Sequence, residues 1–289
     1  MKLTKKLLAM LLALAMVFAL AACSGNGAPA ASDAPGTAST EPDPTPAHSE
    51  EQDSEASFTT VEAGKLHMST SADFPPYEMT TDDGGFEGID VEVATAIAEK
   101  LGLELVVDDM GFAAALTAVQ TGQSDIAMAG ITVNEERKEV MDFSNTYATG
   151  VQVVIVREDS PIQTIDDLAS AAMIGCQADT TGYIYCSDTV ENGGYGEDHV
   201  TAYETGALAV MALVNGQVDA VVIDNEPAKS FVAANEGLKI LDSEWLVEDY
   251  AIAVAKGNTA LLDAINQAMA ELIADGTFQS IVDKYITAD

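Results

Sequence analysis

The stretch AGITVNEERKEVMDFS, at residues 129–144, places Arg137 just inside an expected helix. Basic residues are scarce in this chain of 289 residues, which carries 12 lysines and arginines against 47 aspartates and glutamates. The apolar run before the helix is expected to form a strand that ends at the open edge of a sheet, where α/β proteins bind ligands. An arginine at that edge predicts an anion as its partner, and a planar guanidinium fits a carboxylate with two parallel hydrogen bonds.

The segments that would position Arg137 alternate between strand and helix. The stretches KLHMSTS (65–71) and LELVV (103–107) alternate in polarity as half-buried strands do. Between them, Asp90 is expected to cap a helix that Gly102 ends. The apolar face of this helix carries Ala94, Ile97, Ala98 and Leu101. The alternation of strands and helices predicts an α/β fold.

A second stretch of sequence repeats the one that leads to Arg137. AVQTGQSDIAMAG (118–130) and ALVNGQVDAVVID (212–224) share a helix end, the motif Gly-Gln-x-Asp and an apolar strand. The repeat predicts two lobes of related construction. The alternative is that both stretches are ordinary helix–turn–strand junctions, which Gly-containing turns form in many folds.

The N-terminus has the three-part layout of a secretory signal peptide at residues 1–22. Three lysines precede an apolar run at residues 7–20, which is too short for a dependable membrane span, and small residues then lead to Cys23. The sequence LAAC resembles the lipobox of bacterial lipoproteins, in which the cysteine becomes the lipidated first residue of the mature chain. We therefore expect Cys23 to be lipidated, with an ordinary signal peptide or a core cysteine as the alternatives.

Residues 23–57 are predicted to be the lipidated cysteine and a disordered acidic tether. The segment is dominated by Ala, Ser, Thr, Pro, Gly and acidic residues and holds no Lys or Arg. Loss of residues 1–22 removes three lysines, which leaves nine basic residues against 47 acidic ones and a net charge of −38. A chain this acidic is not expected to bind nucleic acid or anionic headgroups.

Residues that could bind a metal or act as nucleophiles are few. Cys176 and Cys186 would lie on a strand and on the helix after it, which permits either a disulfide or two thiols, and we favour two thiols. The histidines, His48, His67 and His199, lack the spacing of a metal site. The sequence shows neither a Gly-rich phosphate loop nor a nucleophile–base pair, so we expect no cofactor, no metal and no enzymatic activity.

Five segments carry a family resemblance through their order and spacing. They are SADFPPYE, GFEGIDVEVATAIAEKLG, GFAAALTAVQTGQSDIAMAGITVNEERKEVMDFS, VDAVVIDNEPA and GTFQSIVDKYI, and they span about residues 65–286. Together they resemble the extracellular solute-binding protein family 3, the amino-acid receptors of ABC importers. Each segment alone would be a weak signal, but their combination over this length is specific.

The resemblance implies a two-lobed α/β protein with the type II periplasmic-binding-protein fold, whose lobes close around a ligand. Lobe 1 would comprise residues 58–147 and 251–289, and lobe 2 would comprise residues 148–250. Two strand-like crossings would join the lobes near residues 147–152 and 248–253.

The resemblance also assigns the charged contacts to the ligand. Arg137 would bind the α-carboxylate of a free amino acid, helped by N–H groups around Gly130 and Thr132 and by the Thr132 hydroxyl. Asp224, in the second lobe, would bind the α-ammonium, so that one ligand joins both lobes. The alternative role for Asp224 is to cap the following helix, although Asn225 is expected to take that position.

Two aromatic residues and two threonines complete the expected site. Phe74 and Phe112 match positions that sandwich the aliphatic stem of the ligand, and Phe74 lies in a proline-bounded loop, where an apolar ring needs a functional reason. Thr180 and Thr181 open a helix that would close on the carboxylate, since helix N-termini bind anions. Their alternative role is N-capping, which is compatible with ligand binding.

Three places depart from the family pattern, one of which is Tyr147-Ala148, where the family more often has paired aromatic residues at the first crossing. Asp179 stands where the family usually has glycine, so either the turn is altered or an acidic side chain faces the cleft. Ser71 occupies a position that is often acidic in receptors for cationic amino acids, and its neutrality argues against arginine or lysine as the ligand. The two hints oppose each other, so the ligand side chain stays open, and we favour a polar, neutral amino acid.

The resemblance implies a lipid-anchored, monomeric, extracytoplasmic receptor that delivers its amino acid to the permease subunits of an ABC transporter. Two other functions stay open, because a fold does not determine function. One is an enzyme on the same scaffold, similar to the cyclohexadienyl dehydratases. The other is a ligand receptor for a sensor protein.

Overall fold

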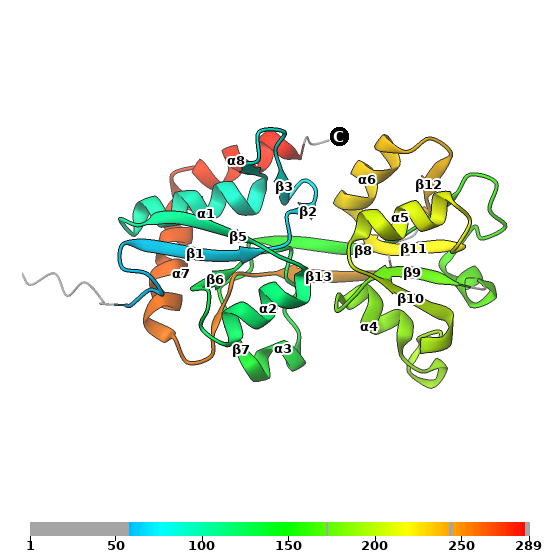
Figure 1. Cartoon of the computed structure of the whole chain (residues 1–289), viewed down its shortest axis with the longest axis horizontal. Coiled ribbons are helices and arrows are strands. Elements are labelled where there is room, and N and C mark those ends of the chain that lie inside the picture. The colour runs from blue at the N-terminus through cyan, green and yellow to red at the C-terminus, as the bar shows by residue number, and fades with distance from the viewer. Residues whose placement is uncertain (1–57, 172, 243–244, 287–289) are drawn as a thin grey trace, which may run out of the picture. The chain divides into compact units, whose positions relative to one another are not determined.

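The computed structural model describes residues 58–171, 173–242 and 245–286, which form two lobes, each built on one main sheet (Figure 1). The predicted two-lobed α/β fold is thereby confirmed. The predicted signal peptide, Cys23 and the predicted tether lie outside the described residues. Within the part of the chain that the structure describes, no helix has both the length and the apolar character needed to cross a membrane.

Lobe 1 contains a five-stranded sheet in the order β5-β1-β6-β14-β7 and a small sheet in the order β2-β3-β4. β1 pairs in parallel with β5 and β6, whereas β14 is antiparallel to β6 and β7. The strands are β1 (Lys65–Thr70), β2 (Asp73–Phe74), β3 (Glu78–Thr80), β4 (Phe86–Glu87), β5 (Glu104–Asp109), β6 (Ile126–Ala127), β7 (Met141–Phe143) and β14 (Ala253–Ala255). The helices are α1 (Ile89–Lys100), α2 (Phe112–Gln120), α3 (Glu135–Val140), α7 (Thr259–Ala274) and α8 (Thr277–Tyr285).

Lobe 2 contains a sheet in the order β10-β9-β11-β8-β12, and β13 pairs with β8. The strands are β8 (Ala148–Arg157), β9 (Ile174–Gln177), β10 (Val200–Tyr203), β11 (Ala220–Asp224), β12 (Leu238–Ile240) and β13 (Leu246–Tyr250). The helices are α4 (Thr181–Ser187), α5 (Gly206–Val214) and α6 (Asn225–Ala234), with short 3-10 segments at Ile165–Ser170, Val190–Asn192 and Glu197–His199.

The chain passes between the lobes twice, from β7 to β8 and from β13 to β14 (Figure 1). β8 and β13 are antiparallel neighbours, with Ala148 opposite Tyr250. The N–H of Tyr147 donates to Tyr250 O at 3.0 Å, and Thr132 of lobe 1 forms a β-bridge with Tyr250. The segment around Thr132 therefore lies directly beside the passage between the lobes.

Helix α1 has the predicted apolar face, but Asp90 does not cap it. Ala94, Ile97 and Ala98 are buried, and Gly102 follows the helix end with a left-handed φ of 69°. The N-cap is Gly88, and Asp90 is the second helical residue, with no exposed surface. The expectation that Asp90 caps this helix was wrong, because its carboxylate is buried and accepts hydrogen bonds from Gly130 N and the Tyr147 hydroxyl within lobe 1.

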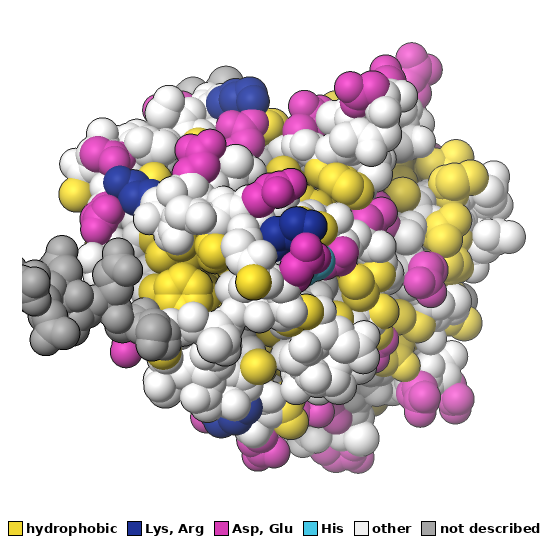
Figure 2. Space-filling model, turned by 60° about the vertical axis from the view of Figure 1, so that its left-hand side comes forward, with side chains coloured by type: hydrophobic (Ala, Val, Ile, Leu, Met, Phe, Trp, Pro, Cys, Tyr) yellow, Lys and Arg dark blue, Asp and Glu magenta, His cyan; other side chains and the backbone are white. Residues whose placement is uncertain are grey.

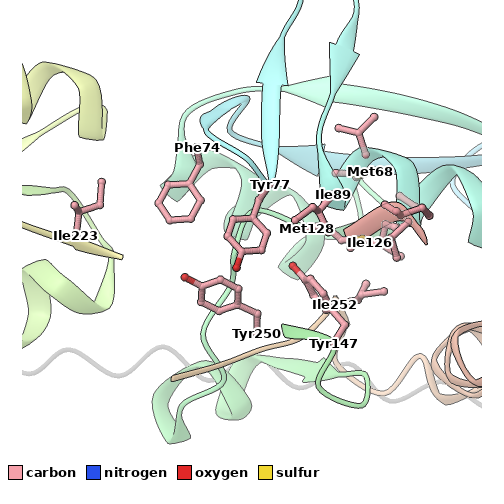
Figure 3. Packing of buried hydrophobic residues seen from close by; sticks show 14 of the residues in the cluster. Met68, Phe74, Tyr77, Ile89, Ile126, Met128, Tyr147, Ile223, Tyr250 and Ile252 are labelled. Carbon is pink, nitrogen blue, oxygen red and sulfur yellow. The ribbon is translucent and has the colours of Figure 1, made fainter. Parts of the chain in front are cut away.

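The apolar core of lobe 1 reaches the edge that faces lobe 2. Met68, Ile126 and Met128 lie in the interior, with Phe74, Tyr77 and Tyr250 grouped at one side of them (Figure 3). Burying one such side chain stabilises the fold by about 1.5–3 kcal/mol. The aromatic group at this edge is therefore held by a packed core rather than by a free loop.

The two remaining cysteines lie where the sequence placed them, Cys176 on β9 and Cys186 on α4. Both are buried and neither forms a disulfide. The surface is strongly acidic, in keeping with the composition. Figure 2 shows Asp and Glu side chains scattered widely over one face, with few Lys and Arg side chains among them.

Candidate ligand-binding site

A pocket of about 460 Å³, partly open to solvent, lies where residues of the two lobes meet. All the residues that the sequence proposed for the ligand line it: Phe74, Phe112, Gly130, Thr132, Arg137, Thr180, Thr181 and Asp224. Ser71, which was expected to bear on the ligand side chain, also lines the pocket. The other lining residues had no predicted ligand contact: Asp73, Glu78, Ala129, Gln152, Gln177, Val222 and Ile223. Asp73 and Glu78 lie within the quoted stretch SADFPPYE, so their acidity was the signal that could have identified them.

Arg137 is held in place by its own helix and by backbone carbonyls of both lobes. Asn134 caps α3, and its side chain accepts a hydrogen bond from Arg137 N at 2.8 Å. The guanidinium donates from Nη1 to Thr132 O at 2.8 Å and from Nη2 to Asp179 O, in lobe 2, at 3.1 Å. Because a guanidinium has five N–H donors, others remain for an anion.

The environment of the Arg137 guanidinium is buried and partly aromatic. The side chain lies 5.4 Å from the centre of the Phe112 ring, and the residue is only 7% exposed. Burial lowers the pKa of Arg137, and the nearby Glu248 carboxylate opposes that shift. A guanidinium stays protonated in proteins, so Arg137 presents a fixed, partly desolvated positive charge to the pocket.

Asp224 provides the opposite charge from the end of β11. Its Oδ1 accepts a hydrogen bond from the Tyr250 hydroxyl, and its Oδ2 accepts one from Gln152 Nε2 at 2.9 Å. Burial raises the pKa of Asp224 to about 7, and the Glu248 carboxylate adds to the shift. The Oε1 atom of Gln152 is buried with no hydrogen-bond partner in the described structure, so an ammonium here would find a second acceptor.

The capping alternative for Asp224 is resolved by geometry. Asp224 occupies the N-cap position of α6, but its side chain makes no capping hydrogen bond. Asn225 is the first residue of the helix, so the expectation that it provides the cap was wrong. The Asp224 carboxylate is therefore committed to the pocket and to Tyr250 and Gln152 rather than to the helix.

The threonine hydroxyls are engaged within the protein. Thr180 caps α4 by accepting a hydrogen bond from Tyr183 N at 3.3 Å, as its alternative role predicted. Thr181 Oγ1 donates to Glu248 Oε2 at 2.9 Å, and Thr132 Oγ1 donates to the same atom at 3.3 Å. Sequence reasoning missed Glu248, a buried carboxylate on β13 that holds hydroxyls from both lobes.

The expected contribution of Gly130 needs a correction. Its N–H donates to Asp90 Oδ2 at 3.1 Å and is therefore engaged within lobe 1. A Cβ at this position would lie 2.8 Å from Cε1 of Phe74, so glycine is required for the close approach of that ring. The N–H of Thr132 makes no hydrogen bond to any described residue, which leaves it as the backbone donor beside Arg137.

The apolar walls come from aromatic side chains of lobe 1. Phe74 and Phe112 are 8% and 7% exposed, so their rings are almost wholly covered. Phe74 stacks on Tyr77 at a centroid distance of 6.0 Å, and Tyr77 meets the edge of Tyr250 at 5.3 Å. Phe74 of lobe 1 and Ile223 of lobe 2 both line the pocket, and Figure 3 shows Ile223 across from Phe74.

The two departures that bear on the ligand, Asp179 and Ser71, have different outcomes. Asp179 is exposed and adopts a φ of 61°, so the turn keeps a left-handed residue, which aspartate tolerates better than most residues. Its side chain is not among those that line the pocket. Ser71 is buried in the pocket wall, and its Oγ donates to Asp73 Oδ1 at 3.2 Å.

Residues 66–288 match the family of bacterial extracellular solute-binding proteins, family 3. The chain belongs to this family. The arginine-binding extracellular protein ArtP of Bacillus subtilis is 31% identical over 233 residues, which cover 78% of this chain and 87% of that protein. Among the described residues of this family member, no cluster of His, Cys, Asp and Glu side chains is arranged to hold a metal ion.

Two solved structures extend the comparison of this family member. An ancestral arginine-binding protein bound to glutamine has a TM-score of 0.72 and 34% identity, covering 78% of this chain and all of the other. An ancestral amino-acid-binding protein described as a precursor of cyclohexadienyl dehydratase has a TM-score of 0.70 and 28% identity, covering 77% of this chain and 95% of the other. Both are similar over nearly their full lengths.

Proposed function

We propose that this protein captures a free L-amino acid outside the cytoplasm and delivers it to the permease of an ABC transporter. One observation carries the proposal: Arg137 of lobe 1 and Asp224 of lobe 2 line the same pocket. A free amino acid is the small molecule whose carboxylate and ammonium match this pair of opposite charges. The names of the relatives, which include binding proteins for arginine, support the same class of ligand.

Binding is coupled to closure of the lobes in this proposal. A ligand that contacts Arg137 and Asp224 favours the closed arrangement, because it interacts with both lobes only in that state. The limits of the lobes lie near residues 147 and 250 in this proposal. The lobes would rotate about β8 and β13, as in the hinge closure of periplasmic binding proteins.

Isothermal titration calorimetry of the mature protein against the 20 common L-amino acids tests the proposal. We expect heat of binding for one amino acid or one chemical group of them. The absence of binding for all of them would overturn it. Prephenate and arogenate, followed by ultraviolet spectra, test the dehydratase alternative that the ancestral relative raises, and turnover of either would establish an enzyme.

The anchoring part of the proposal concerns Cys23. We infer that a lipid on this cysteine retains the protein at the membrane, because the acidic chain itself is repelled by anionic headgroups. A Cys23→Ala variant should keep its ligand affinity but leave the membrane fraction of expressing bacteria. Equal membrane retention of both forms would show that Cys23 is not the anchor.

A further inference from the structure

The end of the pocket at β2 carries a carboxylate that the pair Arg137 and Asp224 does not use. Asp73 lines the pocket, and one of its oxygens accepts the hydrogen bond from Ser71 Oγ. Ser71, which is only 5% exposed, therefore orients the carboxylate instead of providing one. The negative charge expected of a receptor for cationic ligands is present, two residues further along the chain.

Acidic groups from both lobes surround Asp73. Asp109, at the end of β5, accepts a hydrogen bond from Ala72 N at 2.9 Å and so lies against the Asp73 loop. Glu204 belongs to lobe 2, but its side chain contacts lobe 1. Its Oε1 lies 2.6 Å from the position that a Cβ on Gly111 of lobe 1 would occupy. Burial, with the charges of Asp109 and Glu204, raises the pKa of Asp73 to about 6.

Among the residues that the structure describes, no ion pair includes Asp73, Asp109 or Glu204, so these three carboxylates have no paired cation there. Arg137, the cation of the pocket, is the predicted partner of the ligand carboxylate. The α-carboxylate of a bound amino acid would pair with Arg137 and its α-ammonium with Asp224. Neither group would neutralise Asp73, so this end of the pocket would keep its negative charge.

A second observation concerns hydrogen-bond donors. Glu78 lines the same pocket with no exposed surface, and its carboxyl oxygens receive no hydrogen bond from an N–H group or hydroxyl of the described structure. Burial and the neighbouring Asp90 carboxylate raise the pKa of Glu78 well above its usual value, so it is a neutral carboxyl group beside Asp90. The negative charge of the pocket wall near β2 and β3 therefore belongs to Asp73, and the wall is rich in carboxyl oxygens. A ligand side chain that carries several N–H donors and no acceptor fits such a wall.

We infer that the pocket selects an amino acid with a cationic side chain, whose guanidinium or ammonium group ends beside Asp73 and Glu204. The inference rests on the proposed function and replaces the neutral ligand expected from Ser71 alone. Phe74 and Phe112 suit the same ligand, because aromatic faces cover an aliphatic stem and attract a cation at its end.

Calorimetry with L-arginine and L-citrulline tests the inference. The two ligands have the same chain length, but citrulline carries a neutral urea in place of the guanidinium. We expect arginine to bind at least about tenfold more tightly, the effect of one hydrogen-bonded charge pair. In Asp73→Asn the ratio of the two affinities should fall towards one. Asp82→Asn, which neutralises an exposed acid on the same lobe, should leave the ratio unchanged.

Glu204→Gln provides a second variant, since this exposed side chain can change without risk to the core. It should lower the arginine affinity and spare the citrulline affinity. Citrulline or L-glutamine binding as tightly as arginine and L-lysine would overturn the inference and leave the proposed function intact. Equal losses for arginine and citrulline in Asp73→Asn would also overturn it. Failure of every amino acid to bind would instead overturn the proposed function.

Discussion

The two lobes contain the same helix–turn–strand junction and deliver opposite charges from it. In lobe 1, Gly122 has a φ of 69° and Gln123 N donates to Ala118 O at 2.8 Å. In lobe 2, the repeated sequence gives Gly216 a φ of 70°, and Gln217 N donates to Ala212 O at 2.8 Å. The repeat seen in the sequence is therefore a repeat of backbone geometry.

The aspartate of the motif has the same structural task in both lobes. Asp125 accepts hydrogen bonds from Val61 N at 2.7 Å and His67 N at 2.8 Å, and so ties the junction to β1. Asp219 accepts one from Met173 N at 3.0 Å, just before β9. Each junction is thus fastened to the neighbouring parallel strand of its own sheet.

The lobes differ in the segment that comes after the junction. The short strand β6 ends at Ala127, and the chain continues past Thr132 into α3, which carries Arg137. The longer strand β11 runs to Asp224, so its last residue is itself the charged group. One backbone unit can therefore serve a donor site or an acceptor site, depending on the residues at and beyond the end of its strand.

The largest loss of affinity is expected when the charge that lobe 2 contributes to the pocket is removed. Asp224→Asn keeps the shape of the side chain and should weaken ligand binding by about 2–5 kcal/mol, the cost of truncating one partner of a buried charge pair. Calorimetry measures the loss. The asparagine amide can replace only one of the two acceptor oxygens that bind the Tyr250 hydroxyl and Gln152 Nε2, so the thermal midpoint of the ligand-free variant is measured alongside to separate lost folding from lost binding. Unchanged affinity would remove Asp224 from the site.

The matching change in lobe 1 is Arg137→Lys. An ammonium keeps the charge but loses the planar fork, so the affinity should fall by roughly 1.5–3 kcal/mol. Arg157→Lys is the control, since Arg157 Nη1 donates to Leu213 O and Val218 O, outside the pocket. The control should change the thermal midpoint and leave the affinity unaltered. The opposite pattern would show that Arg137 is structural.

The Asp224 carboxylate also predicts a dependence on pH that the Arg137 guanidinium does not contribute. The pKa of Asp224 is raised to about 7 among Glu248, Tyr250 and Gln152, and an ammonium binds its ionised form. Affinity should be full above pH 7 and fall about tenfold per pH unit as the pH drops further below this pKa. Calorimetry in buffers of different ionisation enthalpy should detect proton release near pH 6. A constant affinity from pH 8 to pH 5 would contradict this.

The raised pKa of Asp224 also affects the stability of the ligand-free fold. Lower pH weakens ligand binding but favours this fold. Between the ordinary value of 3.8 and about 7, the folded protein keeps a proton on Asp224 that the unfolded chain has lost. This group therefore stabilises the ligand-free fold at low pH and loses that contribution as the pH rises through this window. In Asp224→Asn this part of the pH dependence should be absent.

The smallest effects should come from the junctions themselves. Gly122→Ala and Gly216→Ala place a side chain where nothing lies within 4 Å, so only the left-handed backbone is penalised. Each should lower the free energy of unfolding by roughly 1–2 kcal/mol, with similar values in the two lobes. Asparagine at either position should cost less than alanine, because it tolerates this conformation. Denaturant unfolding that gave clearly different costs would show that the junctions are not equivalent.

Local patterns in the sequence determined the fold class and several site residues. Strand and helix periodicity predicted the α/β alternation and the buried face of α1, since these depend on residues a few positions apart. The Gly-Gln-x-Asp repeat predicted the paired junctions for the same reason. The position of Arg137 just inside an expected helix marked it as the partner of an anion, whereas the ligand roles of Arg137 and Asp224 came from the family resemblance.

Only the tertiary structure decided how the polar groups of the pocket are shared. Asp90 takes the N–H of Gly130, and Glu248 takes the hydroxyls of Thr132 and Thr181, although the partners lie at least 40 residues apart in the chain. The roles inferred for Ser71 and Glu204 likewise depend on Asp73. Glu204 is far from Asp73 in the sequence, so no local pattern could have linked the two residues. A buried polar group must find a partner, but the sequence near it does not say which distant segment the fold brings within reach.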